Sequence, residues 1–147
     1  MKYWDDFKAG ESIALGSHTI TEAEILEFAR QFDPQPFHVD PEAAKSSVFG
    51  GLIASGWHTG AMWMRLYVDS LLDGAAAMGS PGIEELRWLA PVRPGDTLRC
   101  RFTLIDSRPS GSKSDRGVAR FRYEVVDQTD RAVMTMVLIQ LLRRRPL

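Results

Sequence analysis

A long apolar stripe between residues 57 and 71 constrains the fold more than any other feature of the sequence. Its members recur at spacings of four, three, four and three residues: Trp57, Ala61, Met64, Val68 and Leu71. This spacing places five apolar side chains along one face of an α-helix. Such a face stays out of water only when another layer covers it. The sequence therefore predicts a long helix that begins near Ala54 or Ser55 and packs against a second layer.

The second half of the chain has the patterns of a β-sheet. Two stretches alternate apolar and polar residues, Leu98–Leu104 and Val118–Asp127, and a third, Ala132–Leu142, is almost continuously apolar. Alternation is typical of half-buried antiparallel strands, and a continuous apolar run is typical of a central strand. The polar stretch Ser107–Gly117 is predicted to be a mobile hairpin connection. Helices followed by strands indicate an α+β fold in which an antiparallel sheet covers one long helix.

The size, charge and cysteine content of the chain limit its function. A length of 147 residues predicts one domain spanning residues 1–147, and a formal net charge of -1 argues against nucleic acid or an anionic membrane as a partner. Cys100 is the only cysteine, which excludes an internal disulfide and a multi-cysteine metal site. The sequence has no signal core and no apolar run of about 20 residues. We therefore expect a cytoplasmic protein.

Two further helices are expected ahead of the long one. Thr21 and Glu24 have the spacing of a capping box, which predicts a helix start. The prolines of the stretch FDPQPFHVDP, Phe32–Pro41, must end this helix. Asp40 with the proline that follows it predicts a second, short helix that runs to about Lys45.

Asp33 and His38 stand five positions apart between these two helices. Pro34 and Pro36 remove backbone donors and fix φ, so the segment from Asp33 to His38 is predicted to run as a stiff, extended loop. Such a loop would bring two proton-transferring side chains to one water or substrate. Taken alone, the two residues fit better as a helix cap and a backbone-bonded histidine, because short motifs match by chance.

A second candidate element lies where the long helix should begin. The stretch VFGGLIASGWHTG, Val48–Gly60, places Ser55 and Gly56 at that point. Gly56 has no side chain, so a substrate carbonyl oxygen can reach its N–H, and the helix N-terminus adds partial positive charge. This arrangement predicts an oxyanion site. For a lone glycine, close helix packing is the alternative.

Together the two stretches resemble the MaoC-like acyl dehydratases, the family that includes the R-specific enoyl-CoA hydratases. Asp33, Pro36 and His38 match the family's D-x-N-P-x-H loop, although Gln35 stands where many members have Asn.

The resemblance extends to two later segments. Ala54–Trp57 matches the family's small residue, glycine and bulky apolar residue at the start of the central helix, and LRWLAPVRPGDTL, Leu86–Leu98, resembles the strand and turn ahead of its last strands. Three separated elements in the family's order therefore support the resemblance.

The resemblance implies a hotdog fold, an antiparallel sheet wrapped around a long central helix. It also implies a homodimer or higher homo-oligomer that acts on an acyl-CoA thioester in fatty acid metabolism. Asp33 and His38 would activate a water that adds to C3 of a trans-2-enoyl thioester, and dehydration of a 3-hydroxyacyl-CoA would reverse this. The N–H of Gly56 would stabilise the thioester oxygen, with Ser55 and Trp57 beside it as substrate-binding residues. No metal and no cofactor are implied, since coenzyme A belongs to the substrate.

Other roles stay open beside this one. His58, one turn into the long helix, is an auxiliary candidate that either lines the acyl pocket or packs at the helix start. A hotdog acyl-CoA thioesterase often has its acid on the central helix, but Asp69 is the only acidic residue between Ser55 and Leu72. A non-catalytic acyl-CoA-binding protein has the same fold but does not need a paired Asp and His.

Overall fold

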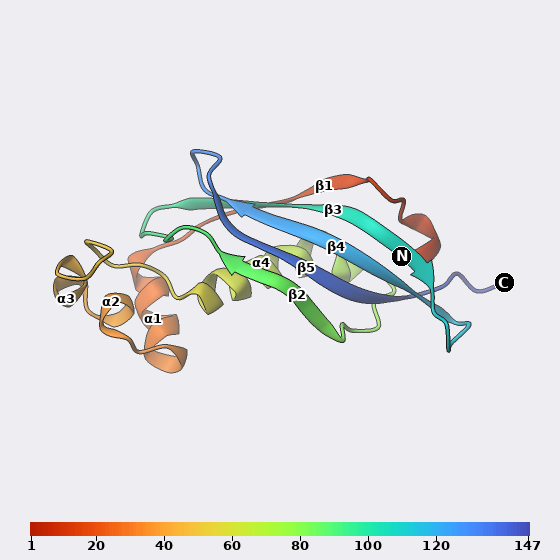
Figure 1. The fold of residues 1–147 in the computed structure, drawn as a ribbon, viewed down its shortest axis with the longest axis horizontal. Coiled ribbons are helices and arrows are strands. Elements are labelled where there is room, and N and C mark those ends of the chain that lie inside the picture. Colours follow the sequence, from red (N-terminus) through yellow and green to blue (C-terminus); the bar gives the residue numbers. More distant parts are fainter.

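The computed structural model describes every residue from Met1 to Leu147 and combines one antiparallel sheet with a long helix that lies across it (Figure 1). The five strands have the order β1-β3-β4-β5-β2. Their bounds are Ser12–Thr19 for β1, Gly82–Trp88 for β2, Thr97–Pro109 for β3, Arg116–Val126 for β4 and Ala132–Arg143 for β5. The four helices are α1 (Glu22–Phe32), α2 (Pro36–Val39), α3 (Pro41–Lys45) and α4 (Gly56–Ser70), and short 3-10 turns lie at Trp4–Asp6 and Leu72–Gly74. The α+β prediction is confirmed.

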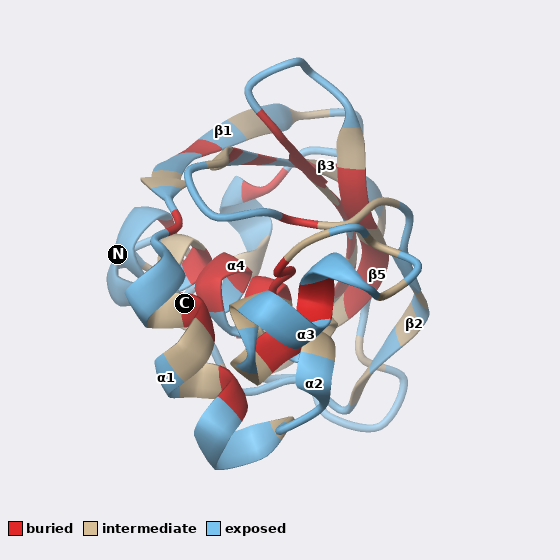
Figure 2. Cartoon of the chain, turned by 90° about the vertical axis from the view of Figure 1, so that its left-hand side faces the viewer, coloured by how far each residue is buried: buried red, intermediate tan, exposed pale blue.

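The core lies between α4 and the concave face of the sheet, where the buried residues of both gather (Figure 2). The alternating apolar residues of β4 have no exposed surface: Ala119, Phe121, Tyr123 and Val125. Trp63 and Tyr67 of α4 pack on the ring of Tyr123, with centroids 4.9 and 5.1 Å away. The predicted half-buried strand is therefore correct, and β5, which pairs with both β4 and β2, is an internal strand as expected.

The apolar stripe predicted on the long helix does not pack against the sheet. Trp57 is 60% exposed, Met64 41% and Val68 37%, and only Leu71, just beyond the helix, is buried. The buried residues of α4 are Thr59, Met62, Trp63 and Tyr67. Because α4 is apolar on both faces, periodicity alone could not tell which face the sheet covers. The predicted stripe is left as an exposed apolar surface.

The hairpin between β3 and β4 is shorter than the polar stretch Ser107–Gly117 predicted. Ser107 pairs with Ala119 and Pro109 with Gly117, so both strands continue into the stretch. The strand pairing there extends beyond the core, and polar side chains are tolerated because water reaches them. Only residues 110–115 form the connection.

The three short helices lie together at one end of the molecule, beside the N-terminus of α4 (Figure 1). The predicted capping box forms, with Glu24 N–H donating to Thr21 Oγ1 over 3.1 Å. The prediction of an extended loop from Asp33 to His38 is wrong in its second half, because α2 begins at Pro36. Proline is favoured in the first helical turn, where its missing N–H costs no hydrogen bond.

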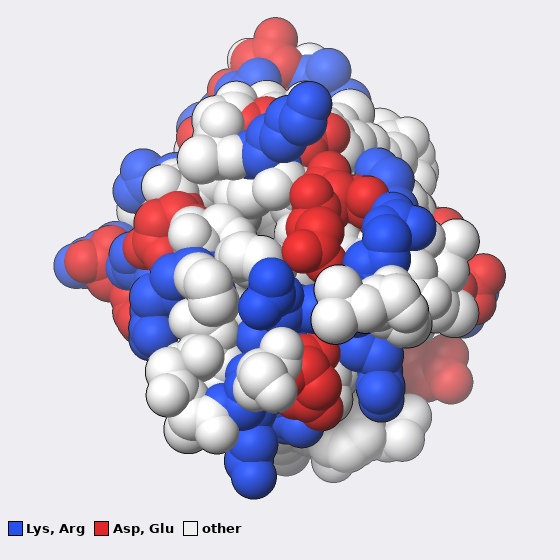
Figure 3. All heavy atoms as spheres, turned by 90° about the vertical axis from the view of Figure 1, so that its right-hand side faces the viewer, with Lys and Arg blue, Asp and Glu red and all other residues white.

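The opposite end of the molecule holds both termini and a mixed surface of basic and acidic side chains (Figures 1 and 3). Arg145 bonds to Asp6 over 2.6 Å, and Arg116 bonds to Asp115 over 2.7 Å. Positive and negative charges therefore alternate on this face and produce no field of one sign. None of the helices combines the length and the apolar character that a membrane crossing requires.

Candidate active site

His38 is the buried histidine of the candidate site. It lies in α2 with 5% of its surface exposed, and its Nδ1 is 2.7 Å from the backbone oxygen of Ile53. A carbonyl oxygen only accepts hydrogen bonds, so Nδ1 carries the hydrogen. The other ring nitrogen, Nε2, is therefore the atom that can take up or release a proton.

The carboxylate of Asp33 faces this nitrogen. Asp33 caps the C-terminal end of α1, and its Oδ2 lies 3.3 Å from His38 Nε2. Ser55 donates its hydroxyl to Oδ2 over 2.7 Å, and the side-chain amide of Gln35 donates to Oδ1 over 2.7 Å. Partial burial raises the pKa of Asp33, but these two hydrogen bonds and the nearby His38 outweigh it, so the pKa lies below its ordinary value. Asp33 is thus held as a carboxylate.

The first turn of α4 lies next to this pair. Ser55 is its N-cap and accepts from the N–H of Trp57, so one hydroxyl links the helix start to Asp33. The N–H of Gly56 has no acceptor within the chain. A side chain at Gly56 would collide with Trp88, because an added Cβ would stand 2.5 Å from the indole ring. Close packing therefore requires glycine here, and the N–H of this glycine keeps its hydrogen-bonding capacity free.

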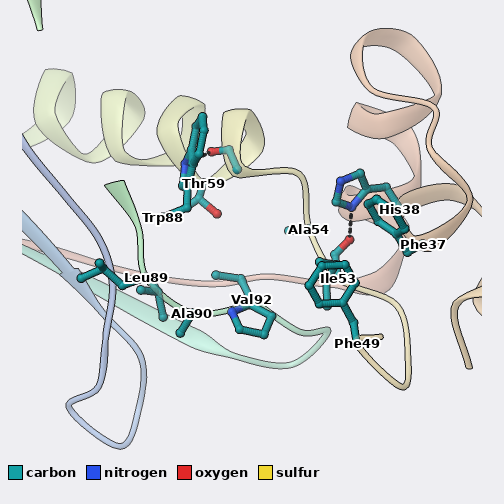
Figure 4. Close-up of a pocket in the computed structure, with 13 residues that line it drawn as sticks. Phe37, His38, Phe49, Ile53, Ala54, Thr59, Trp88, Leu89, Ala90 and Val92 are labelled. Atoms are coloured by element: carbon teal, nitrogen blue, oxygen red, sulfur yellow. Dashed lines mark hydrogen bonds between the residues drawn. The ribbon is translucent and has the colours of Figure 1, made fainter. Parts of the chain in front are cut away.

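A cavity of about 390 Å³ begins at these groups and runs between α2, α4 and the sheet (Figure 4). His38 lies at one end with Phe37 and Phe49, and Thr59 and Trp88 lie across the cavity from it. The remaining lining is mostly apolar: Ile53, Ala54, Gly56, Leu89, Ala90, Pro91, Val92 and Val133. An apolar cavity with few polar groups at one end is typical of a small-molecule site. The arrangement suits proton transfer to a mostly hydrophobic ligand.

The structure brings together four of the six predicted site residues. His38 and Gly56 line the cavity, and Asp33 and Ser55 contact each other behind them. Trp57 points away and lines a separate apolar groove.

His58 also lies outside the cavity. Its ring stacks on Phe28 of α1 with 4.7 Å between centroids, in a hollow on another side of α4. Burial lowers the pKa of His58, while Glu24 raises it. The interpretation of His58 as a packing residue agrees with this position.

Two residues of the site had not been predicted. Gln35 holds the second oxygen of Asp33, although it seemed only a departure from the family's Asn. Trp88 covers Gly56, from which it is separated by 32 positions in the sequence. The resemblance of Leu86–Leu98 to the family's strand and turn indicated a strand at Trp88, but nothing local indicated that its ring would reach α4.

Comparisons with known proteins agree with this arrangement. A family model described as a MaoC like domain matches residues 7–126. The MaoC-like dehydratase of Rhodospirillum rubrum has a crystal structure with a TM-score of 0.93 and 40% identity, and the match covers all of both chains. The (R)-specific enoyl-CoA hydratase of Rhodospirillum rubrum is 33% identical over 110 residues, which is 74% of each protein.

The fold has a more distant match as well. A Mycobacterium tuberculosis protein described as a double hotdog fold has a TM-score of 0.83 at 19% identity, over 99% of this chain and 45% of that one. At this identity the match shows the fold alone. The sheet wrapped around α4 is therefore a hotdog fold, as expected.

Proposed function

The chain belongs to the MaoC-like domain family, and we propose that it is a hydro-lyase that adds water to a trans-2-enoyl-CoA or removes it from a 3-hydroxyacyl-CoA. One observation carries the proposal. The Asp33 carboxylate lies 3.3 Å from His38 Nε2, and His38 and Gly56 both line the cavity. A base, a proton carrier and an oxyanion donor are the three groups that this reaction needs.

Asp33 and His38 hold the attacking water in this mechanism. The two acceptor atoms lie 3.3 Å apart, so a water beside both of them can donate one hydrogen to His38 Nε2 and the other to the Asp33 carboxylate. A water that donates to both groups has its oxygen lone pair free for attack. The lowered pKa of Asp33 keeps the base ionised at neutral pH.

Each bond change can be assigned to a group. The water oxygen bonds to C3 while its proton passes to the Asp33 carboxylate. The C2–C3 π electrons shift toward the thioester oxygen, whose negative charge the N–H of Gly56 stabilises. C2 then takes a proton from the Asp33 and His38 pair, which gives the 3-hydroxyacyl thioester. Dehydration follows the same steps in reverse. The mechanism includes no metal or cofactor, because Asp33, His38 and the N–H of Gly56 already supply the base, the proton carrier and the oxyanion donor.

The proposal includes a second copy of the chain. Large apolar residues are exposed on the outer face of α4 and on β2: Trp57, Met64, Val68, Ile83 and Trp88. The strand β2 is also an edge of the sheet. An exposed apolar patch beside an open edge is typical of a protein interface. A homodimer formed through α4 and β2 would cover this surface and lie next to the cavity.

The test is hydration of crotonyl-CoA, followed as loss of the ultraviolet absorbance of the enoyl thioester. Asp33→Asn keeps the size of the side chain but removes the base, and we expect kcat to fall by about 10² to 10⁴-fold. Asp40→Asn is the matched control, since it changes a nearby carboxylate that only caps α3 and asparagine caps equally well.

Three results would contradict the proposal. Full activity in Asp33→Asn would show that Asp33 is not the base. If the wild-type protein hydrates neither crotonyl-CoA nor longer or branched enoyl thioesters, it does not catalyse the proposed reaction. Release of free thiol without a hydrated product would instead favour thioester hydrolysis.

A further inference from the structure

We propose that the hydroxyl of Thr59 is a second hydrogen-bond donor to the thioester oxygen, beside the N–H of Gly56. The inference rests on the proposed function and adds a substrate-binding residue to its site. Oxyanion sites are built from preorganised donors that point at the oxygen on which charge develops. Thr59 lies in α4, three positions beyond Gly56, and lines the same cavity.

The side chain of Thr59 is buried, with 2% of the residue exposed, but its hydroxyl has no hydrogen-bond partner within the chain. Leaving aside tyrosine, tryptophan and cysteine, five residues bury a polar or charged side chain. The other four all form side-chain hydrogen bonds: His38, Ser55, Asp127 and Gln140. A buried hydroxyl without a partner is costly, so folded proteins normally satisfy it. Because Thr59 lies on the cavity wall, a bound ligand can supply the partner.

The backbone of α4 does not supply this partner. A threonine hydroxyl in a helix can donate to the carbonyl oxygen four residues earlier. For Thr59 this atom is the oxygen of Ser55, which already accepts from the N–H groups of His58 and Thr59 over 3.0 and 3.2 Å. Two donors occupy the two lone pairs of a carbonyl oxygen. The hydroxyl of Thr59 therefore remains free to donate to a ligand.

Helix geometry brings the two donors together. Side chains three positions apart are neighbours on a helix, and each leans toward the helix N-terminus. The side chain of Thr59 therefore lies over the first turn of α4, where the N–H of Gly56 is also without an acceptor. Trp88 holds this turn in place, because its Nε1–H donates to the oxygen of Gly56 over 2.9 Å.

The position of Thr59 in the cavity suits the thioester end of the substrate. Figure 4 shows Thr59 across the cavity from His38. A thioester oxygen that accepts from Thr59 and Gly56 therefore leaves C2 and C3 of the acyl group on the side of the Asp33 and His38 pair. Both donors act on the same oxygen while its negative charge develops.

The test measures kcat and KM for crotonyl-CoA in Thr59→Val and Thr59→Ser. Valine has nearly the shape of threonine but cannot donate, whereas serine keeps the hydroxyl and is the matched control. We expect Thr59→Val to lower kcat by about 10²-fold with little change in KM, because the oxygen carries most of its charge in the transition state. Thr59→Ser should keep most of the wild-type kcat. Thr59→Ala also lacks the donor and gives the same comparison if the valine variant does not fold.

Two further measurements separate a donor from a packing residue. Butyryl-CoA has no C2–C3 double bond, so it binds without being hydrated, and an isotope label at its thioester carbonyl identifies that stretch in the infrared spectrum. Loss of a donor leaves the carbonyl less polarised, so the stretch of the bound ligand should move to higher frequency in Thr59→Val but not in Thr59→Ser. The acid limb of the kcat/KM profile should stay in place in Thr59→Val, because the hydroxyl does not bond to Asp33.

Three results would overturn the assignment. Full kcat in Thr59→Val, or a carbonyl stretch that does not move, would show that the hydroxyl does not donate to the thioester oxygen. A shifted acid limb would show that Thr59 acts through Asp33 instead. Each of these results leaves the hydratase activity of the wild type intact, whereas a wild type that hydrates no enoyl thioester overturns the proposed function and this inference together.

Discussion

Ser55 links two parts of the site with a single hydroxyl group. Its oxygen accepts from the N–H of Trp57 and so caps α4, while its hydrogen goes to the carboxylate of Asp33. The start of the helix and the proposed base are therefore positioned by the same atom. Gln35 holds the other oxygen of Asp33, so both oxygens have a donor. These donors stabilise the charged form of Asp33 and oppose the effect of its partial burial.

Removing the hydroxyl should change the pH dependence of the reaction. In Ser55→Ala the carboxylate loses a donor, so we expect the pKa of Asp33 to rise toward its ordinary value or above. Because the ionised carboxylate is the active form, the acid limb of the kcat/KM profile should move to higher pH. Gln35→Ala should shift it in the same direction. A profile that stays in place in both variants, measured with crotonyl-CoA, would contradict this role for the two donors.

At the scale of elements, α1 and α4 are connected through His58 and Phe28. The two rings are stacked with an interplanar angle of 8°, and His58 Nδ1 is buried without a hydrogen-bond partner. Burial lowers the pKa of His58 below its ordinary value of 6.5, and Glu24 and His18 act on it in opposite directions. Arg65 also lines this hollow. The folded chain therefore favours the neutral ring.

This preference predicts a loss of stability in acid. The unfolded chain binds a proton to His58 more readily than the folded chain does. The contribution of His58 to stability is therefore present above about pH 6.5 and is lost as the pH falls toward the lower folded pKa. His58→Phe keeps a stacking ring but cannot titrate, so the free energy of unfolding should depend less on pH between about 6.5 and 5. Urea unfolding at several pH values checks this, and equal slopes in both proteins would count against it.

At the scale of the whole molecule, the exposed face of α4 continues onto the edge strand β2. Trp57 and Met64 lie on the helix, Ile83 lies on the strand, and the groove between the two elements is apolar. One side of α4 thus completes the core of the chain, and the other remains exposed to water. The apolar content of the helix fits a protein that buries both sides after association.

A charge on this face should weaken self-association. We expect Met64→Glu to shift the protein toward monomer, because burying an unpaired carboxylate opposes assembly. Ile105→Glu is a matched control: Ile105 has the same exposure as Met64, 41%, but lies on β3. Sedimentation equilibrium of the three proteins measures the effect. A monomeric wild type, or a Met64→Glu protein that still associates fully, would show that this face is not the interface.

Local sequence signals predicted where most elements begin and which strand faces are buried. The cap of Thr21 with Glu24, the cap of Asp40 before Pro41, and the start of α4 at Ser55 all form as predicted. Each depends on residues within about one helical turn of each other, so neighbouring sequence contains the whole signal. Asp33, His38 and Gly56 could be chosen as candidates for a related reason, since their resemblance to a known family lies in short contiguous motifs.

The sequence by itself determined the element types, the α+β class and the motif residues of the site. Only the tertiary structure decided which face of α4 is buried, since Trp63 and Tyr67 fit the helical period as well as Trp57 and Met64 do. It also decided that the ring of Trp88 lies on Gly56. The physical reason is that periodicity shows which faces of a helix are apolar but not what each face packs against. That depends on how segments distant in the sequence fill the core together.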